Sequence, residues 1–226
     1  MNGTLYIVST PIGDEDDITY RALRILKEAD LILFEEKKTA RQFFTRHKLN
    51  DKRHESINEH NEDEISDVIV QYLRDGENIA LISDAGTPVF SDPGWILVDK
   101  AIKSGIKIVP VPGPSSIVPA LVLSGFYINE FVFYGFLSPK AGERKAELRR
   151  LLNEPRTIVI MDTPYRLIPL LRDLGEVFVR ERRIAVAFNL TMEGEQVFRG
   201  WANELFEYFN RIKLKGEFVI VIEGMR

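Results

Sequence analysis

The sixteen residues Ile79-Ala-Leu-Ile-Ser-Asp-Ala-Gly-Thr-Pro-Val-Phe-Ser-Asp-Pro-Gly94 decide the fold class of this 226-residue chain. Ile79–Ser83 is a short, nearly continuous apolar run, which is typical of a strand buried on both faces of a sheet. Two glycines and two prolines interrupt the pattern, and Trp95–Lys103 resumes with the apolar spacing of a helix. A buried strand, a loop and a helix in this order form the repeating unit of an α/β fold.

The same alternation extends to both sides of this stretch. It predicts strands at Leu5–Ser9, Leu31–Phe34 and Lys107–Val111, and helices at Ile18–Ala29, Thr39–His47 and Glu62–Arg74. The resulting order of strands and helices is typical of an open, mainly parallel sheet.

The strongest break in the chain is Pro110-Val-Pro-Gly-Pro114, which can continue neither a helix nor a central strand. We therefore predict two α/β domains, residues 1–113 and 114–226. Residues 1–113 carry 14 Lys and Arg against 20 Asp and Glu, and residues 114–226 carry 16 against 14, so the net charge changes from −6 to +2 at this point. For the second domain the pattern predicts helices at Ser115–Ser124, Arg144–Leu152, Tyr165–Gly175 and Asn203–Phe209, and strands at Phe131–Leu137, Thr157–Asp162, Arg183–Asn189, Gln196–Gly200 and Glu217–Glu223.

Composition excludes several classes of protein. With 45% hydrophobic and 28% charged residues, the chain is neither disordered nor of low complexity. The absence of cysteine excludes disulfides, thiolate metal sites and cysteine nucleophiles, and His54 and His60 have no zinc-ligand partners, so no metal is expected. No apolar run is long enough to cross a membrane, and a strand pattern begins at Leu5 without a signal peptide, so we expect a soluble cytoplasmic protein.

Three loops at predicted strand ends have compositions suited to binding a small molecule. They are Ser9–Asp14, Ser83–Gly94 and Pro112–Ser116. Ligands of open parallel sheets bind beyond the carboxyl ends of the strands, where glycine permits close approach and a helix start offers free N–H groups. Neither G-x-G-x-x-G nor a P-loop occurs, which argues against a Rossmann dinucleotide site or an ATPase.

Several motifs together resemble the tetrapyrrole methylase superfamily, and within it the branch that methylates ribosomal RNA. The matching motifs, which run from residue 3 to about 224, are Leu5-Tyr-Ile-Val-Ser-Thr-Pro-Ile-Gly13, Asp17-Ile-Thr-Tyr-Arg-Ala-Leu23, Glu59-His-Asn-Glu62, Ser83-Asp-Ala-Gly-Thr-Pro88, Ser91-Asp-Pro-Gly94, Val111-Pro-Gly-Pro-Ser115 and Gly135-Phe-Leu137. The resemblance implies two α/β domains with S-adenosylmethionine in a cleft between them, a homodimer, and methyl transfer to a cytidine 2′-hydroxyl of 16S rRNA in the small ribosomal subunit.

The resemblance also implies roles for individual residues. The residues expected to bind the cofactor are Pro11, Gly13, Asp84, Ala85, Gly86, Thr87, Phe90, Ser115 and Ser116, with Met161 and Leu190 from the second domain. Core packing remains an equal alternative for Met161. The candidates for a base that helps the hydroxyl to react are Glu36, His60 and Asp92. The residues expected to bind the substrate are Lys37, Lys38, Arg41, Asn61, Lys140, Arg144, Tyr165, Arg166 and Asn189.

Further basic residues lie beside these candidates: Arg46 and Lys48, then Lys145, Arg149 and Arg150, and finally Arg180, Arg182 and Arg183. Groups of basic residues like these can bind an RNA backbone, although such groups more often only face solvent.

Three segments depart from the family pattern and keep other functions open. Glu35-Glu-Lys-Lys38 stands where Glu-Asp-Thr-Arg is expected, Asp162-Thr-Pro-Tyr-Arg166 where Glu-Ser-Pro-His-Arg is expected, and Phe188-Asn-Leu-Thr-Met192 where Arg-Glu-Leu-Thr-Lys is expected. The cofactor motifs are intact while the substrate-side motifs differ. The alternatives are therefore a methylase of a small planar or polyanionic metabolite, and a cofactor-binding sensor or scaffold without catalysis.

Overall fold

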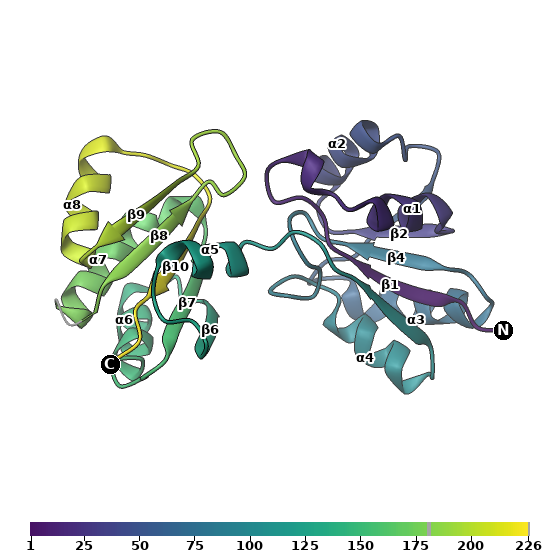
Figure 1. Cartoon of the computed structure of the whole chain (residues 1–226). Helices are drawn as coiled ribbons and strands as arrows, with labels where there is room; N and C mark the ends of the chain where they lie inside the picture. Colours follow the sequence, from purple (N-terminus) through teal and green to yellow (C-terminus); the bar gives the residue numbers. More distant parts are fainter. Residues whose placement is uncertain (180–181, 226) are drawn as a thin grey trace. The chain divides into compact units, whose positions relative to one another are not determined.

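A five-stranded parallel sheet forms the centre of the first half of the chain in the computed structural model, which describes residues 1–179 and 182–225 (Figure 1). Its strands are β1 (Thr4–Val8), β2 (Leu31–Phe34), β3 (Arg53–Ser56), β4 (Ile79–Ile82) and β5 (Lys107–Val111). They lie in the order β3-β2-β4-β1-β5, and every pair is parallel. The predicted parallel sheet is confirmed.

Helices cover both faces of this sheet. They are α1 (Tyr20–Glu28), α2 (Lys37–His47), α3 (Glu62–Arg74) and α4 (Trp95–Lys103), with a short 3-10 turn, η1, at Glu15–Asp17. Apolar residues of α1 and α2 pack in one cluster with Val8, Ile32 and Ile82, whereas those of α3 and α4 pack in a second cluster with Leu31 and Leu81. Since neighbouring residues of a strand point to opposite faces, the two helix pairs lie on opposite sides of the sheet.

The edge strand β3 has no counterpart among the strands predicted from the sequence. Its residues, Arg53-His-Glu-Ser56, contain no apolar side chain, so no hydrophobic pattern marks it. β3 pairs only with β2 among the described strands, and a polar composition is common in edge strands because it discourages pairing with other chains.

A mixed sheet forms the second half of the chain. Its strands are β6 (Phe131–Phe136), β7 (Thr157–Asp162), β8 (Ile184–Phe188), β9 (Gln196–Gly200) and β10 (Phe218–Ile222), in the order β6-β7-β10-β8-β9. β6 and β7 are parallel, and β10 is antiparallel to both β7 and β8. The carboxyl ends of β6, β7 and β8 therefore lie at the same edge of this sheet.

Four helices pack on this second sheet: α5 (Ile117–Ser124), α6 (Ala141–Arg150), α7 (Leu167–Phe178) and α8 (Ala202–Ile212), with the 3-10 turn η2 at Pro164–Arg166. α6, α7 and α8 share one hydrophobic cluster with Ile158, Ile160 and Ile220, while α5 contacts β8, β9 and β10. α7 continues three residues beyond the end predicted at Gly175. Gly175 does not end the helix; a Cβ there would lie 1.8 Å from Asn203 Oδ1, so the side chain of Asn203, at the start of α8, occupies the space that glycine leaves on α7.

The chain divides into two compact units, residues 1–115 and 116–226. This division lies two residues beyond the boundary expected from the sequence. Two α/β units agree with the predicted fold class. No helix within the described residues is both long and apolar enough to cross a membrane. Arg180, one of the basic residues named above, lies outside the described residues.

Candidate functional site

The loops singled out in the sequence all leave the first sheet at one edge. Its five strands are parallel, so the loops after β1, β4 and β5 begin side by side at the carboxyl ends. β1 and β4 are neighbours, yet the next helices, α1 and α4, lie on opposite faces of the sheet. Two neighbouring strands whose connections diverge in this way open a crevice between them, and such crevices bind the ligands of open α/β sheets.

Two of these loops are joined directly across the crevice. Thr10 and Gly86 form an isolated antiparallel bridge, with N···O distances of 2.8 and 3.1 Å. The buried Thr10 hydroxyl donates to the carbonyl of Ser83 at 3.0 Å, and the Ser83 hydroxyl donates to that of Gly86 at 3.1 Å. Ser9 and Thr87 share a hydroxyl hydrogen bond of 2.9 Å. These hydrogen bonds join mostly buried polar groups, and they fix the shape of the loop.

Two positions of this edge favour glycine. Gly86 has φ +85°, a conformation that side chains disfavour, and a Cβ on it would have Ile12 Cγ2, at 3.5 Å, as its nearest neighbour. A Cβ on Gly113 would lie 3.0 Å from the Cβ of Ser9, so the loop after β5 passes close to the end of β1. Ala85 and Thr87 are exposed on either side of Gly86, and the Ala85 amide has no hydrogen-bond partner among the described residues.

The second part of the Ser83–Gly94 loop is strained. Val89 and Ser91 have φ values of 72° and 71°, and a β-branched residue such as valine rarely adopts this conformation. Phe90, between them, is 47% exposed. Strained backbone of this kind persists where the surrounding structure holds it, and it concentrates at functional sites.

Glu62 holds the end of this strained loop, a role not expected from the sequence. Its side chain is buried, and Oε1 accepts hydrogen bonds from the amides of Gly94 at 2.9 Å and Ile96 at 2.7 Å. It therefore caps the N-terminus of α4 from the first turn of α3. The only sequence signal for it is the Glu59-His-Asn-Glu62 motif itself.

The same motif contains two of the predicted site residues. Asn61 is half-buried, and its side chain accepts from the amide of Asn58 at 2.7 Å and donates to the carbonyl of Ser56 at 3.0 Å. It shapes the turn after β3. His60 is exposed at the same edge of the sheet, and its amide donates to Asn58 Oδ1 at 3.0 Å.

Carboxylates gather where β2, β3 and β4 end. Burial, followed by repulsion from Asp92, Asp84, Glu59 and Glu36, raises the pKa of Glu35 to about 7. Burial and then repulsion from Asp84 raise the pKa of Asp92 to about 6, against the effect of a hydrogen bond from Ser83. Burial likewise raises the pKa of Asp84, whose carboxylate accepts the amide of Glu36 at 3.2 Å. This edge consequently repels anions and favours a cationic ligand.

Glu36 and the three predicted basic residues lie at the start of α2. The Glu36 carboxylate caps this helix by accepting the amide of Lys38 at 3.2 Å. Lys37, Lys38 and Arg41 are exposed on the first turns. A pocket of about 60 Å³ lies between α2 and the ends of β1, β2 and β4, and its lining includes Pro11, Thr39 and Asp84.

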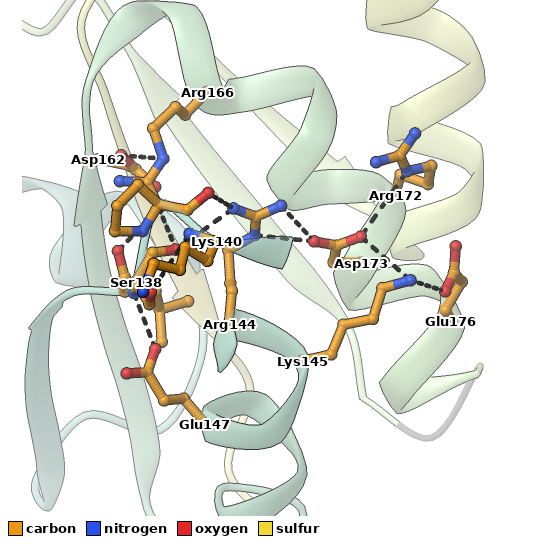
Figure 2. A network of polar contacts seen from close by, with 12 residues as sticks. Ser138, Lys140, Arg144, Lys145, Glu147, Asp162, Arg166, Arg172, Asp173 and Glu176 are labelled. Atoms are coloured by element: carbon orange, nitrogen blue, oxygen red, sulfur yellow. Dashed lines mark hydrogen bonds and ion pairs between the residues drawn. The ribbon is translucent and has the colours of Figure 1, made fainter. Parts of the chain in front are cut away.

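In the second unit, an ion-pair network fixes the loop that follows β6. Figure 2 shows Arg144 and Arg166 reaching this loop from two sides. Arg144 donates to the carbonyls of Ser138 and Pro139, and Arg166 to those of Leu137 and Ser138. Arg166 also pairs with the buried Asp162 at 3.2 Å. The network thus holds the loop that carries Lys140.

The structure corrects the expectation that Arg144 binds the substrate. Its side chain is only 4% exposed, and its Nε donates to the fully buried Asp173 at 2.8 Å. An arginine whose donors are engaged in this way is a structural residue of the α6–α7 contact. The sequence gives no sign of this pair, because the two partners lie 29 residues apart.

The other predicted residues of the second unit lie near the carboxyl ends of β6, β7 and β8. Lys140 is exposed and pairs with Glu143 at 3.0 Å. Tyr165 is 79% exposed, with the ammonium of Lys215 5.8 Å from its ring centroid. Asn189 adopts φ 48° and donates from its side chain to the carbonyl of Glu193 at 3.2 Å.

Met161 and Leu190 complete the set of predicted residues in the second unit. Met161, within β7, is half-buried, and Leu190, after β8, is buried. Their role in cofactor binding stays a prediction. Ser115 and Ser116 are half-buried where the chain passes from the first unit to the second.

Comparison with known proteins adds to this geometry. A family model described as tetrapyrrole (corrin/porphyrin) methylases matches residues 4–205. The chain belongs to the tetrapyrrole methylase family. Among solved structures, the methyltransferase CobJ covers 98% of the chain with a TM-score of 0.72 at 15% identity. Uroporphyrin-III C-methyltransferase from Thermus thermophilus also covers 98%, with a TM-score of 0.66 at 21% identity. At these identities the likeness concerns the fold.

Curated relatives are more similar in sequence than the solved structures are. Ribosomal RNA small subunit methyltransferase I of Thermotoga maritima is 39% identical over 222 residues, covering 98% of this chain and 99% of the relative. The proteins of the same name in Pseudomonas aeruginosa and Bacillus subtilis are 39% and 37% identical, each covering 98% of this chain and 79% and 75% of the relative.

Membership of the family makes this tetrapyrrole methylase homologue a methyltransferase whose methyl donor is S-adenosylmethionine. The crevice of the first unit fits that cofactor. Gly86 and the exposed residue Ala85, whose amide has no hydrogen-bond partner among the described residues, offer backbone for close contact. The carboxylates Asp84 and Asp92 complement the positive charge of a sulfonium. No group of residues that could hold a metal ion occurs in the part of the chain that the structure describes.

Proposed function

We propose that this protein transfers a methyl group to the 2′-hydroxyl of a cytidine in 16S rRNA, within the small ribosomal subunit in the cytoplasm. The observation that supports the proposal most is the similarity to ribosomal RNA small subunit methyltransferases I, at 37–39% identity over 98% of the chain. The exposed basic residues on α2, beside the carboxyl edge, agree with an RNA substrate.

The residues of the crevice have separate tasks in this reaction. When bound, S-adenosylmethionine supplies an electrophilic methyl group on a positively charged sulfur. The backbone at Asp84–Thr87, together with Pro11 and Gly13, orients the cofactor, because methyl transfer requires the acceptor oxygen to lie in line behind the sulfur–carbon bond. Lys37, Lys38 and Arg41 hold the RNA, and Asn61 shapes the turn that presents His60.

Asp92 is the candidate that best fits the role of the base. It is half-buried, its pKa is raised to about 6, and the cofactor-binding loop carries it. The Glu36 carboxylate is used as the cap of α2, and His60 is exposed. In this role the Asp92 carboxylate would accept the proton of the attacking hydroxyl, and bound S-adenosylmethionine would supply the methyl group and leave as a neutral thioether.

The test is methylation of small ribosomal subunits from a strain that lacks this protein. We expect labelled methyl from S-adenosylmethionine to enter 16S rRNA of assembled subunits and not free 16S rRNA. A 2′-O-methyl group removes the hydroxyl that attacks the neighbouring phosphodiester, so the labelled site should resist alkaline cleavage. Asp92→Asn should lower kcat by about 10²–10⁴-fold at saturating S-adenosylmethionine.

Two results would contradict the proposal. Label on a small metabolite and on no RNA would favour the metabolite methylase. Cofactor binding without transfer to any RNA fraction would favour the sensor or scaffold.

We also propose that the protein is a homodimer. Phe131 is an aromatic residue 42% exposed at the edge strand β6, whereas Tyr134 of the same strand packs against the core of its own unit. Light scattering coupled to size exclusion should give twice the mass of the 25.9 kDa chain. A mass of one chain at micromolar concentration would contradict this.

A further inference from the structure

The exposed side of α2 is an uncompensated basic surface. Between Lys37 and His47 the helix contains no acidic residue, and its apolar residues Ala40, Phe43 and Phe44 face the core. Within the described residues, no ion pair involves Lys37, Lys38, Arg41, Arg46 or Lys48.

Some basic residues elsewhere in the same unit are paired with carboxylates. Arg24 pairs with Glu28, Arg53 with Glu77, and Lys100 with Asp63 and Asp67. An acidic unit with a net charge of −6 over residues 1–113 has ample carboxylates to neutralise its cations. The other described cations of this unit that lack an ion pair are spread over several elements: Arg21, Lys27, Lys52, Arg74 and Lys107. Only α2 and its C-cap gather five such cations on one element.

The placement of two of these cations works against the stability of the helix. Lys37 and Lys38 occupy the first turn, where the partial positive charge of the helix dipole disfavours cations. Within the described residues of that turn, the cap by Glu36 alone opposes this repulsion. Cations in an unfavourable helix position are expected where an anionic partner offsets the repulsion.

Further along α2, the surface is hollowed into a shallow groove. The groove measures about 550 Å³, and Glu15, Arg41, Gln42, Thr45 and Arg46 line it; we call it the α2 groove. Its one carboxylate is engaged, since Glu15 Oε2 lies 3.0 Å from Nε2 of the largely buried His47. The Thr45 hydroxyl donates to the carbonyl of Arg41 at 2.8 Å. This leaves two guanidinium groups and an amide facing the groove.

The chemistry of the α2 groove fits a phosphodiester chain. Two guanidinium groups bind phosphate oxygens with paired hydrogen bonds, and glutamine and threonine are frequent neutral contacts to the nucleic-acid backbone. The carboxylates of Glu35 and Asp84 repel any anionic ligand, so a strand bound here is held by the cations of α2 and not by the carboxyl edge. These cations extend along a helix about 16 Å long, and a nucleic-acid strand offers one phosphate charge at regular spacing over such a length.

We propose that the α2 groove binds the phosphodiester backbone of the RNA substrate beside the nucleotide that is methylated. This inference rests on the proposed function, since it names the part of the protein that holds the rRNA. The lysines of the first turn continue the same surface toward the carboxyl edge, so the backbone would follow α2 from Arg46 to Lys37.

The test compares two double variants with equal loss of charge. Arg41→Gln with Arg46→Gln alters the α2 groove. The matched control, Arg74→Gln with Lys103→Gln, removes two exposed cations from α3 and α4, on the opposite face of the sheet. Binding of fluorescent small ribosomal subunits is measured from 50 to 300 mM KCl, and S-adenosylmethionine affinity is measured by calorimetry.

We expect the α2 pair to bind subunits about tenfold more weakly at low salt, and the slope of log K against log salt to become shallower by about 1.4–1.8. Both variants should bind S-adenosylmethionine like the wild type, which shows that the first unit is folded. An unchanged affinity and slope in the α2 pair, or an equal loss in the control pair, would overturn the inference. If the wild type methylates subunits in that case, the proposed function still stands; if the wild type neither binds nor methylates them, both fail.

Discussion

Replacing Glu35 by glutamine should stabilise the protein at alkaline pH and have little effect in mild acid. In the native protein, burial and the neighbouring carboxylates raise the pKa of Glu35 from 4.5 to about 7. The native state therefore holds this proton more tightly than the unfolded state does. The resulting stability is fully present below pH 4.5 and is lost as the pH rises through 7.

The magnitude follows from the pKa. A shift from 4.5 to about 7 corresponds to about 3.4 kcal/mol at 1.36 kcal/mol per unit. Glu35 is only half-buried, so solvent screening reduces the expected effect to about 1–2 kcal/mol. Glutamine keeps the shape of the side chain and removes the charge, and it should relieve Asp92 and Asp84 of one repulsive neighbour.

The assay is urea unfolding followed by circular dichroism, at pH 4.5 and at pH 8, for the wild type and Glu35→Gln. The free energy of unfolding of the variant should exceed that of the wild type by about 1–2 kcal/mol at pH 8 and differ by less than about 0.5 kcal/mol at pH 4.5. Titration of ¹³C-labelled glutamate should show one carboxyl with a midpoint near 7. A stability difference that does not depend on pH, or a midpoint near 4.5, would refute the reasoning.

Three further predictions concern the loops and the network. Gly86→Val should abolish S-adenosylmethionine binding in calorimetry while circular dichroism stays native, because a side chain there combines a strained φ with loss of the space that the ligand needs; a folded variant with unchanged affinity would remove Gly86 from the site. Arg144→Met should lower the free energy of unfolding by about 3 kcal/mol, because Asp173 loses its closest partner. Lys140→Gln, which breaks an exposed ion pair, should lower it by less than about 1 kcal/mol. Equal shifts in melting temperature would contradict the structural role of Arg144. Glu62→Ala should lower the free energy of unfolding by about 1–3 kcal/mol and raise the Kd for the cofactor. Glu62→Gln should restore part of the stability and part of the cofactor affinity. An effect on stability alone would limit Glu62 to the role of a helix cap.

The elements that sequence predicts best are those whose pattern is decided locally. Leu31–Phe34 and Thr157–Asp162 are predicted with the observed bounds, because continuous apolar runs bounded by polar residues admit one interpretation. Glu62–Arg74 is equally clear, with apolar residues at helical spacing. The family assignment, the α/β fold and the methyl donor are confirmed, since the loop motifs that carry them are contiguous in sequence.

The errors arise where a residue's role depends on a distant partner. Gly175 looks like a helix end, but its lack of a side chain serves the contact with Asn203, 28 positions later. Arg144 looks like a surface cation, but Asp173 takes it into the interior. Glu62 looks like an ordinary first-turn acid, and only the fold brings the start of α4 to it. Burial and pairing of charged groups are tertiary properties that local patterns do not contain.

The order of strands in the first sheet has a consequence for synthesis on the ribosome. β1 is made first, yet Leu5 pairs with Ile79 and Thr4 with Lys107, so its partners emerge 74 and 103 residues later. At about 5–20 residues per second, this strand waits roughly 4–15 s for β4 and longer for β5. During that interval the apolar run Leu5-Tyr-Ile-Val8 can pair only with strands that are not its neighbours in the folded sheet. Chaperone capture of the nascent chain should therefore be concentrated before residue 111 is exposed, and should decline once β5 can complete the sheet.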